Sequence, residues 1–239
     1  MRSGGWQRRA HGCAAVASSP MKADRWVVLD VGETLIDETR IFRTWAEVFG
    51  MPQFTLMAVL GGSISNEEKP EEWRGFFEML QQPEWRDRQP EVEERFGGFR
   101  EEDLYPDALS ALEGLKANGY RLAITANQPA RRHDELLALG VDVEVMAMSE
   151  EMEVSKPDPS FFARTLELIG SPDPADVAYV GDRVDNDVRP SRAAGMRAVW
   201  IRRGPWGYLH EDRDGAAHLV VRSLDELVER IGEAFDGVG

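Results

Sequence analysis

The feature that most constrains the fold is a regular order of short apolar runs and helix-length amphipathic segments in the second half of the chain. The runs over 120–125, 177–180 and 196–201 predict buried strands, and 218–221 predicts a last one. Between strands, segments such as 106–118 repeat leucines at helical spacing. Further helices are expected over 131–139, from 159 onward and over 223–234. Strands that alternate with helices of this length predict βαβ units and an α/β fold with a parallel sheet.

Residues 37–103 interrupt this order, because they carry helical patterns but no convincing strand. They are interpreted as a helical insertion between a first strand, predicted by the apolar run over 26–29, and the next βα unit. The predicted core therefore comprises 21–36 and 104–239. Residues 1–20 are small and polar without periodicity, which predicts a disordered tail, and Met21 is an alternative start of the chain.

Composition excludes several classes of protein. The formal net charge of −15 makes nucleic acid and anionic membranes unfavourable partners. No apolar stretch approaches the roughly 20 residues that a membrane helix needs. The single cysteine, Cys13, cannot form an internal disulfide, and this usage is typical of a reducing, cytoplasmic location.

Polar side chains gather where the predicted strands end. Asp30, Asn127 and Asp182 each follow an apolar run, and ligands of parallel sheets bind at the carboxyl ends of strands. The segment GDRVDND adds Asp187, and clustered carboxylates suit Mg²⁺, which prefers oxygen ligands. Taken singly, these aspartates fit turns or helix caps equally well, and Lys156 fits a solvated side chain.

Taken together, Asp30 in VVLDVGETL, Lys156 in VSKPDP and the segment GDRVDND resemble the haloacid dehalogenase superfamily in order, spacing and placement at strand ends. The resemblance extends over nearly the whole chain after Met21. It implies a Rossmann-like parallel sheet, with the helical insertion 37–103 acting as a small cap over the active site. The activity it implies is hydrolysis of a small phosphate ester through an aspartyl-phosphate intermediate.

The resemblance also implies a role for each matching residue. Asp30 would be the nucleophile, and Lys156 would stabilise its charge and the phosphoryl oxygens. Asn127 and Lys156 would bind the phosphate group of the substrate. The implied Mg²⁺ ligands are Asp30, the backbone carbonyl of Gly32, Asp182 and Asp187.

Two positions depart from the family pattern. Phosphatases of this superfamily carry a second aspartate two residues after the nucleophile, as general acid and base, and Gly32 stands there instead. Glu33 is adjacent, but neighbouring side chains on a tight turn point in different directions. Ala126 stands where a Ser or Thr is usual, and Thr125, one residue early, is expected on the opposite face of its strand.

These departures leave three functions open. The first is a phosphatase that acts slowly or on activated esters whose leaving group needs no acid. The second is a dehalogenase-type hydrolase of carbon–halogen bonds, which needs no Mg²⁺, so the intact GDRVDND segment argues against it. The third is a binding or regulatory protein on a catalytically degenerate scaffold.

Trp206 is either a loop anchor or a wall of the substrate entrance. The identity of the substrate and the oligomeric state stay open.

Overall fold

The computed structural model describes residues 24–65 and 72–236. Its centre is a six-stranded sheet in the order β3-β2-β1-β4-β5-β6, in which every neighbouring pair is parallel. The strands are β1 (Trp26–Leu29), β2 (Arg121–Ala126), β3 (Val145–Met148), β4 (Val177–Gly181), β5 (Arg197–Ile201) and β6 (Leu219–Val221). The predicted α/β fold with a Rossmann-like parallel sheet is confirmed.

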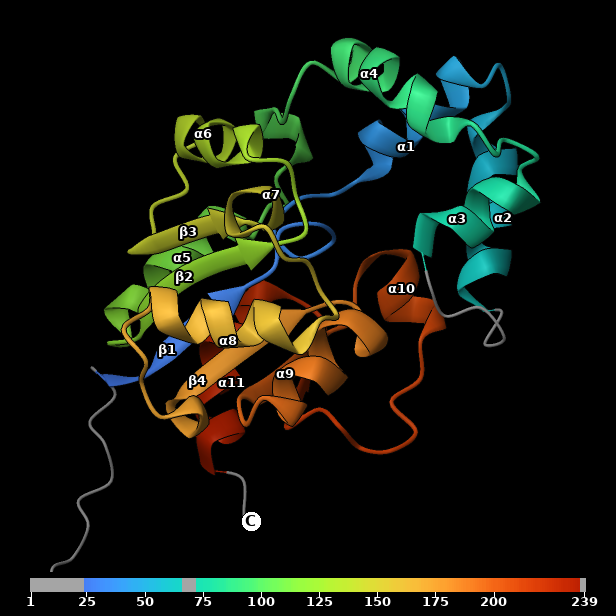
Figure 1. Ribbon diagram of the computed structural model, residues 1–239. Helices are drawn as coiled ribbons and strands as arrows, with labels where there is room; N and C mark the ends of the chain where they lie inside the picture. The colour runs from blue at the N-terminus through green and yellow to red at the C-terminus, as the bar shows by residue number, and fades with distance from the viewer. Residues whose placement is uncertain (1–23, 66–71, 237–239) are drawn as a thin grey trace, which may run out of the picture.

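Helices cover both faces of this sheet, as Figure 1 shows. α5 (Ala108–Ala117) and α11 (Leu224–Asp236) lie on one face, and α8 (Pro159–Leu168) and α9 (Arg189–Ala193) lie on the other. α6 (Arg131–Ala138) and α7 (Ser149–Met152) flank β3, and α10 (Gly204–Leu209) follows β5. Short 3₁₀ turns precede α5 at Glu101–Asp103 (η2) and precede β4 at Pro174–Asp176 (η3).

The alternation of side chains along β1 divides the hydrophobic core between these two helical layers. Val27 and Leu29 pack in the cluster that contains residues of α5 and α11. Trp26 and Val28 point the other way, into the cluster of Phe161 and Phe162 from α8. The sheet is thus buried on both faces, which explains why its strands read as continuous apolar runs.

The predicted boundaries differ from the structure by one or two residues at several elements. The helix expected over 106–118 begins at Ala108, and the carboxylate of Asp107 before it accepts hydrogen bonds from Arg203 and from the backbone N–H of Leu224. Of the apolar stretch Val141–Met148, only Val145–Met148 pairs with β2 as a strand.

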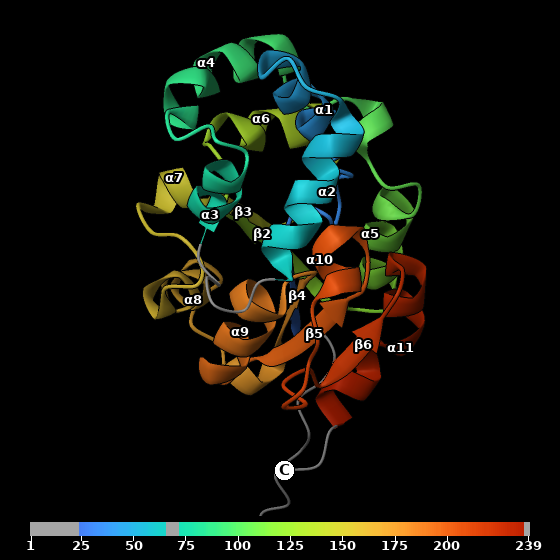
Figure 2. The same cartoon turned by 90° about the vertical axis from the view of Figure 1, so that its right-hand side faces the viewer.

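The segment between β1 and α5 forms a separate group of helices beyond the carboxyl end of the sheet. We call it the insertion: α1 (Thr39–Val48), α2 (Gln53–Ile64), α3 (Glu72–Met79) and α4 (Trp85–Phe96). It has a hydrophobic cluster of its own, rich in aromatic side chains, in which Trp206 of α10 also takes part. Figure 2 shows α10 lying against the end of α2, so the core contacts the insertion at this point.

The tail predicted over residues 1–20 lies outside the described residues. Among the helices that the structure does describe, none has the length and apolar character needed to cross a membrane.

Candidate active site at the carboxyl edge of the sheet

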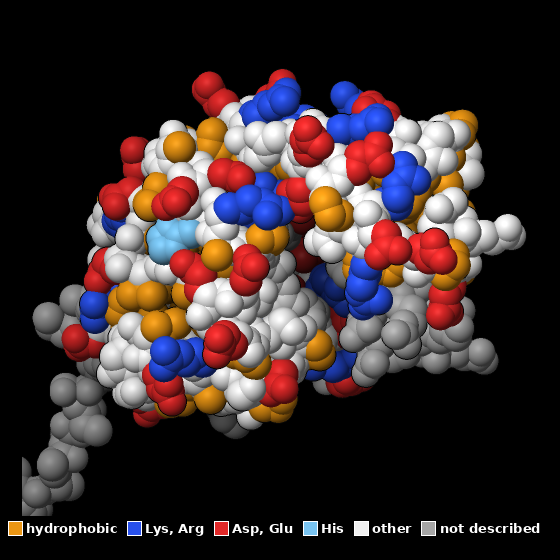
Figure 3. Space-filling model, turned by 45° about the horizontal axis from the view of Figure 1, so that its top comes forward, with side chains coloured by type: hydrophobic (Ala, Val, Ile, Leu, Met, Phe, Trp, Pro, Cys, Tyr) orange, Lys and Arg blue, Asp and Glu red, His pale blue; other side chains and the backbone are white. Residues whose placement is uncertain are grey.

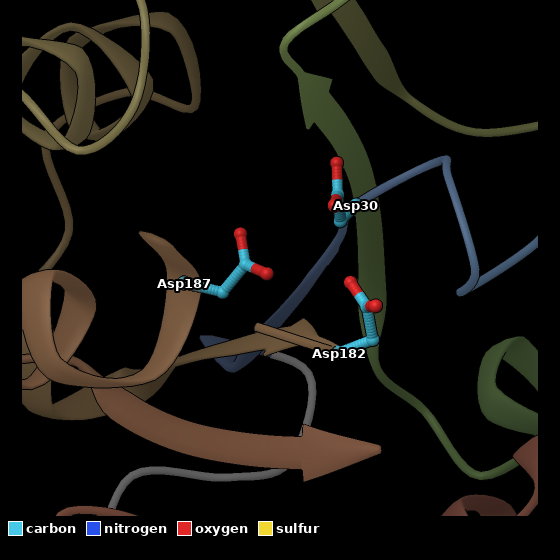
Figure 4. A group of neighbouring side chains, drawn as sticks. All are labelled: Asp30, Asp182 and Asp187. Atoms are coloured by element: carbon cyan, nitrogen blue, oxygen red, sulfur yellow. The ribbon is translucent and has the colours of Figure 1, made fainter. Parts of the chain in front are cut away.

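Three aspartates from different parts of the chain meet at the carboxyl edge of the sheet. Asp30 follows β1, Asp182 follows β4, and Asp187 lies on η4 (Val184–Val188), a single π-helical turn. Their carboxyl groups face a common space (Figure 4), with one oxygen of each within 4.8 Å of the others. Gly181 permits this approach, because a Cβ atom there would overlap the carboxyl group of Asp187.

Lys156 bridges two of these aspartates from the loop before α8. Its Nζ lies 2.8 Å from Oδ1 of Asp30 and 2.6 Å from Oδ1 of Asp187, and its side chain is 1% exposed. Asn127 fixes the backbone of that lysine with both ends of its amide. Its Oδ1 accepts from the Lys156 N–H at 2.8 Å, and its Nδ2 donates to the Lys156 carbonyl at 2.9 Å. The side chain of Asn127 therefore positions the backbone of Lys156.

Burial controls the protonation of this cluster. It raises the pKa of Asp30 to about 6, a shift that Lys156 opposes and Asp187 reinforces. Burial also raises the pKa of Asp182, and the negative charges of Asp187 and Asp30 add to that rise. Burial alone would lower the pKa of Lys156, but Asp187 and Asp30 outweigh it and raise that pKa above its ordinary value. The cluster thus holds three carboxyl groups and one ammonium group, which contacts only Asp30 and Asp187, so it is deficient in positive charge.

Asp182 is the member of the cluster that lacks a partner. Its backbone carbonyl accepts a hydrogen bond from Trp200 Nε1 at 2.8 Å, so its backbone is fixed. Its side-chain Oδ2 is buried without a hydrogen-bond partner among the described residues. A buried, unpaired carboxylate oxygen costs free energy unless a cation or a proton compensates it. The donor set is all oxygen, so the residues fit Mg²⁺.

The structure places Thr125 and Ala126 on opposite faces of β2. The Thr125 hydroxyl is buried against α8, where it lies 3.2 Å from the hydroxyl of Thr165. The Thr125 carbonyl accepts a hydrogen bond from the Tyr179 hydroxyl at 2.8 Å. Ala126 packs in the cluster on the α5 face. The Thr125 hydroxyl is thus engaged in the core.

The segment from Gly32 to Glu38 carries the chain from the sheet edge into the insertion. Glu33 stands in it with a left-handed backbone, φ 49°, and a side chain that is 4% exposed. Its carboxylate accepts hydrogen bonds from the Tyr105 hydroxyl at 2.5 Å and from the backbone N–H of Glu38 at 3.1 Å. Glu33 is therefore anchored by Tyr105 and fixes the start of α1.

Glu38 is the residue of this region that sequence reasoning missed. Its carboxyl group lies against Gly32, where an added Cβ would be 2.6 Å from Oε1. Burial, reinforced by the negative charges of Glu33 and Asp30, raises the pKa of Glu38 to about 8. The sequence signal for Glu38 is weak. It consists of an acidic residue just before the first helix of the insertion, six residues after the glycine that replaces the usual aspartate.

The space-filling view shows a furrow between the core and the insertion, with acidic and basic side chains along its edges (Figure 3). Trp206 lies at the contact between the two parts, 6.3 Å from the ring of Phe42 in α1. The Arg183 guanidinium lies 5.4 Å from the Trp206 ring and pairs with Asp185 at 2.7 Å. Trp206 therefore joins the core to the insertion, as the first of its two predicted roles, the loop anchor, requires.

Known proteins resemble this chain in sequence. The phosphoserine phosphatase of Thermus thermophilus is 35% identical over 147 residues, which cover 59% of this chain and 57% of that protein. The glyceraldehyde 3-phosphate phosphatase of Methanopyrus kandleri is 36% identical over 105 residues, which cover 43% of this chain and 45% of that protein. The chain thus spans about half the length of these relatives.

A solved structure shares the fold. The HAD-hydrolase YfnB of Bacillus subtilis, bound to magnesium, superposes with a TM-score of 0.64 at 18% identity, over 87% of this chain and 98% of that one. The model of the haloacid dehalogenase-like hydrolase family matches residues 25–195, a span that contains Asp30, Lys156, Asp182 and Asp187. The chain belongs to the haloacid dehalogenase-like hydrolases.

Proposed function

We propose that this protein is a Mg²⁺-dependent phosphatase that hydrolyses a small phosphate ester through an aspartyl-phosphate on Asp30. One observation carries the proposal: the Asp30 carboxylate is bonded to the buried Lys156 and faces two further carboxylates at the same sheet edge. The names of the relatives support the substrate class, since both are phosphatases of small phosphate esters.

The residues that would hold Mg²⁺ are Asp30, Asp182, Asp187 and the backbone carbonyl of Gly32. The unpartnered Oδ2 of Asp182 and the shortage of positive charge support this assignment. When bound, the cation supplies charge stabilisation for the phosphoryl oxygens and lets three carboxylates stay ionised side by side.

Asp30, Lys156 and Asn127 have separate roles in the proposed reaction. Asp30 attacks phosphorus with its free oxygen, while its Oδ1 is held by Lys156 at 2.8 Å, which fixes the direction of attack. Lys156 keeps its positive charge and stabilises the negative charge that spreads over the transferring group. Asn127 positions Lys156 through two hydrogen bonds to its backbone. A phosphate contact from Asn127 would come from its backbone N–H or from the second hydrogen of its Nδ2.

We also propose that the insertion acts as a cap over the site. The two chain crossings between core and insertion are fastened together, because the N–H of Asp37 donates to the Asp103 carbonyl at 2.7 Å and Arg40 pairs with the Asp103 carboxylate. Glu93 of α4 reaches the core helix α6, with 2.7 Å contacts to Arg131 and Arg132. A furrow bounded in this way would screen a bound substrate from water.

The single cysteine supports a reducing, cytoplasmic location.

The two other candidate functions make different use of the same residues. A dehalogenase-type hydrolase needs no Mg²⁺, so the unpartnered Oδ2 of Asp182 would have no purpose in it. A degenerate binding protein would not need the ion pair of a nucleophile with a buried lysine. Both alternatives are therefore supported by fewer of the observed contacts than the phosphatase is.

The experiment is a panel of phosphate monoesters assayed with and without Mg²⁺. It should contain 4-nitrophenyl phosphate, phosphoserine, glyceraldehyde 3-phosphate and a simple alkyl phosphate, with 2-chloropropionate as the halogenated control. We expect Mg²⁺-dependent release of phosphate that Asp30→Asn abolishes. Release of chloride without Mg²⁺ would favour the dehalogenase, and no turnover above the Asp30→Asn background would overturn the phosphatase.

A further inference from the structure

Glu38 places a carboxyl group against Gly32, in the turn that follows the nucleophile. Its Oε1 would lie 2.6 Å, and its Oε2 3.3 Å, from a Cβ added at Gly32, two residues after Asp30. The group is thus packed against the turn that follows β1 and leads away from Asp30. Because Glu38 stands immediately before α1, it approaches the site from the insertion.

The Glu38 carboxyl differs from its neighbours because it has no partner within the described part of the chain. Asp37 accepts from the Thr39 N–H at 2.7 Å, and Glu33 accepts from Tyr105 and from the Glu38 N–H. No hydrogen bond or ion pair joins the Glu38 carboxyl to any of the residues 24–65 and 72–236. Its backbone is nevertheless fixed, because its N–H is held by Glu33 and its carbonyl accepts from the Phe42 N–H at 3.1 Å. The backbone of Glu38 is therefore held in place, while its carboxyl oxygens have no partner among the residues that the structure describes.

The position of the Glu38 carboxyl depends on the absence of a side chain at Gly32. Any side chain at position 32 would have to displace the Glu38 carboxyl, because its first atom would already lie 2.6 Å from Oε1. The glycine therefore provides the room that the glutamate occupies. An acidic group does lie beside the nucleophile turn, although it comes from residue 38 and not from residue 32.

The geometry of phosphoryl transfer gives this position a role. Attacking and leaving oxygens lie roughly in line on opposite sides of phosphorus. Asp30 attacks from the sheet edge, so the leaving oxygen points away from the sheet, toward the insertion. We propose that Glu38 is the general acid of this reaction and protonates the leaving oxygen of the substrate. The inference rests on the proposed phosphatase function and deepens it, because it lets the site cleave esters with poor leaving groups.

The proton and electron pairs balance in both steps. In the first, an Asp30 oxygen bonds to phosphorus, the ester P–O bond breaks, and its electron pair takes the Glu38 proton to give the free alcohol. In the second, water adds to phosphorus and gives a proton to the Glu38 carboxylate. The bond from phosphorus to Asp30 then breaks with its electrons, and inorganic phosphate and the Asp30 carboxylate are restored.

The test compares kcat/KM for two substrates in the full chain with Mg²⁺. Release of the alcohol is the first irreversible step, so kcat/KM reports the step in which Glu38 donates its proton. For Glu38→Gln we expect kcat/KM to fall roughly 10²-fold with an alkyl phosphate. With 4-nitrophenyl phosphate, whose leaving group needs no proton, we expect a change of less than about threefold. An equal effect on both substrates, or no effect on either, overturns the role of Glu38.

Glu47→Gln is the matched control, because it makes the same change at an exposed glutamate on α1. It should leave kcat/KM unchanged for both substrates. Asp30→Asn separates the two proposals. If wild type does not exceed that background with 4-nitrophenyl phosphate, the phosphatase function itself fails and the role of Glu38 falls with it. If wild type is active and only the selectivity of Glu38→Gln is absent, the inference about Glu38 fails alone.

A double variant tests whether the effect of Glu38→Gln comes from the loss of the acidic group or from a change in structure. In Gly32→Asp/Glu38→Ala, the carboxyl group moves to residue 32 and the side chain that obstructed it is gone. We expect this double variant to recover alkyl phosphate turnover relative to Glu38→Ala. Gly32→Asp alone should gain nothing, because the two side chains compete for one space. Equal turnover by the double variant and by Glu38→Ala, with both folded, would contradict the assignment.

Discussion

The sheet edge and the segment that leads into the insertion present acidic groups to the same site in opposite ways. At the sheet edge, Asp30 and Asp187 are fixed by Lys156 with contacts of 2.8 and 2.6 Å. In the segment from Gly32 to Glu38, Glu33 is anchored by Tyr105, but the Glu38 carboxyl has no partner within the described part of the chain. The difference indicates that the sheet edge holds charge in place, whereas the entering segment supplies a group that is free to exchange a proton.

Removal of Lys156 should have the largest effect, because this residue holds the aspartates at the sheet edge. Lys156→Met leaves Asp30 and Asp187 facing each other without a counter-charge. We expect a loss of about 3 kcal/mol in the free energy of unfolding, because breaking a buried ion pair strands its partner charges. Phosphatase activity should fall to background. Urea denaturation measures the stability, and Lys116→Met at a partly exposed ion pair serves as control. Similar stability in both variants would show that Lys156 does not organise the edge.

Asp182 and Asp187 should respond differently to the same substitution. Both Asp182→Asn and Asp187→Asn should weaken Mg²⁺ binding in calorimetry. Without metal, Asp182→Asn should raise the melting temperature, because it neutralises a carboxyl whose Oδ2 is buried without a partner. Asp187→Asn should lower it, because the Asp187 carboxylate accepts from Lys156 and from the Arg183 N–H. Unchanged Mg²⁺ binding in both variants would remove them from the metal site.

The pH dependence of stability tests the role of Glu38 in the segment that leads into the insertion. The pKa of Glu38 is about 8 in the folded protein, above its ordinary value, so the folded state binds a proton that the unfolded state has released. The stability linked to that proton is present at lower pH and is lost as pH rises through about 8. The melting temperature without metal should therefore rise when pH falls from 9 to about 7. Glu38→Gln should flatten this slope. An equal slope in both proteins would mean that another group is responsible.

Deletion of residues 1–20 should have the smallest effect. Their composition cannot bury a core, so a chain that begins at Met21 should match the full chain in melting temperature and in activity. A clear loss of either would show that these residues pack against the domain.

The sequence predicted the sheet edge better than the entering segment for a physical reason. Asp30 and Asp182 follow apolar runs, and parallel strands bring their carboxyl ends together whatever the loops do. The position of Glu38 depends on tertiary contacts instead: the left-handed Glu33, the bridge of Gly32 to Ile36 and the bridge of Ile36 to Leu104. None of these follows from local pattern.

Asn127 illustrates the same limit inside the predicted site. Its place after β2 could be predicted from the apolar run before it. Its two hydrogen bonds to the backbone of Lys156, 29 residues away in the chain, could not, because they depend on how the loop before α8 folds back.

The most direct test of the account is to locate the transferred phosphoryl group. The protein with Mg²⁺ should be quenched in acid during turnover of 4-nitrophenyl phosphate, and its peptides mapped by mass spectrometry. We predict one phosphoryl group, on the peptide that carries Asp30, and none in Asp30→Asn. Turnover without phosphorylation of that peptide, or a phosphoryl group on another residue, would contradict the assignment of Asp30 as the nucleophile.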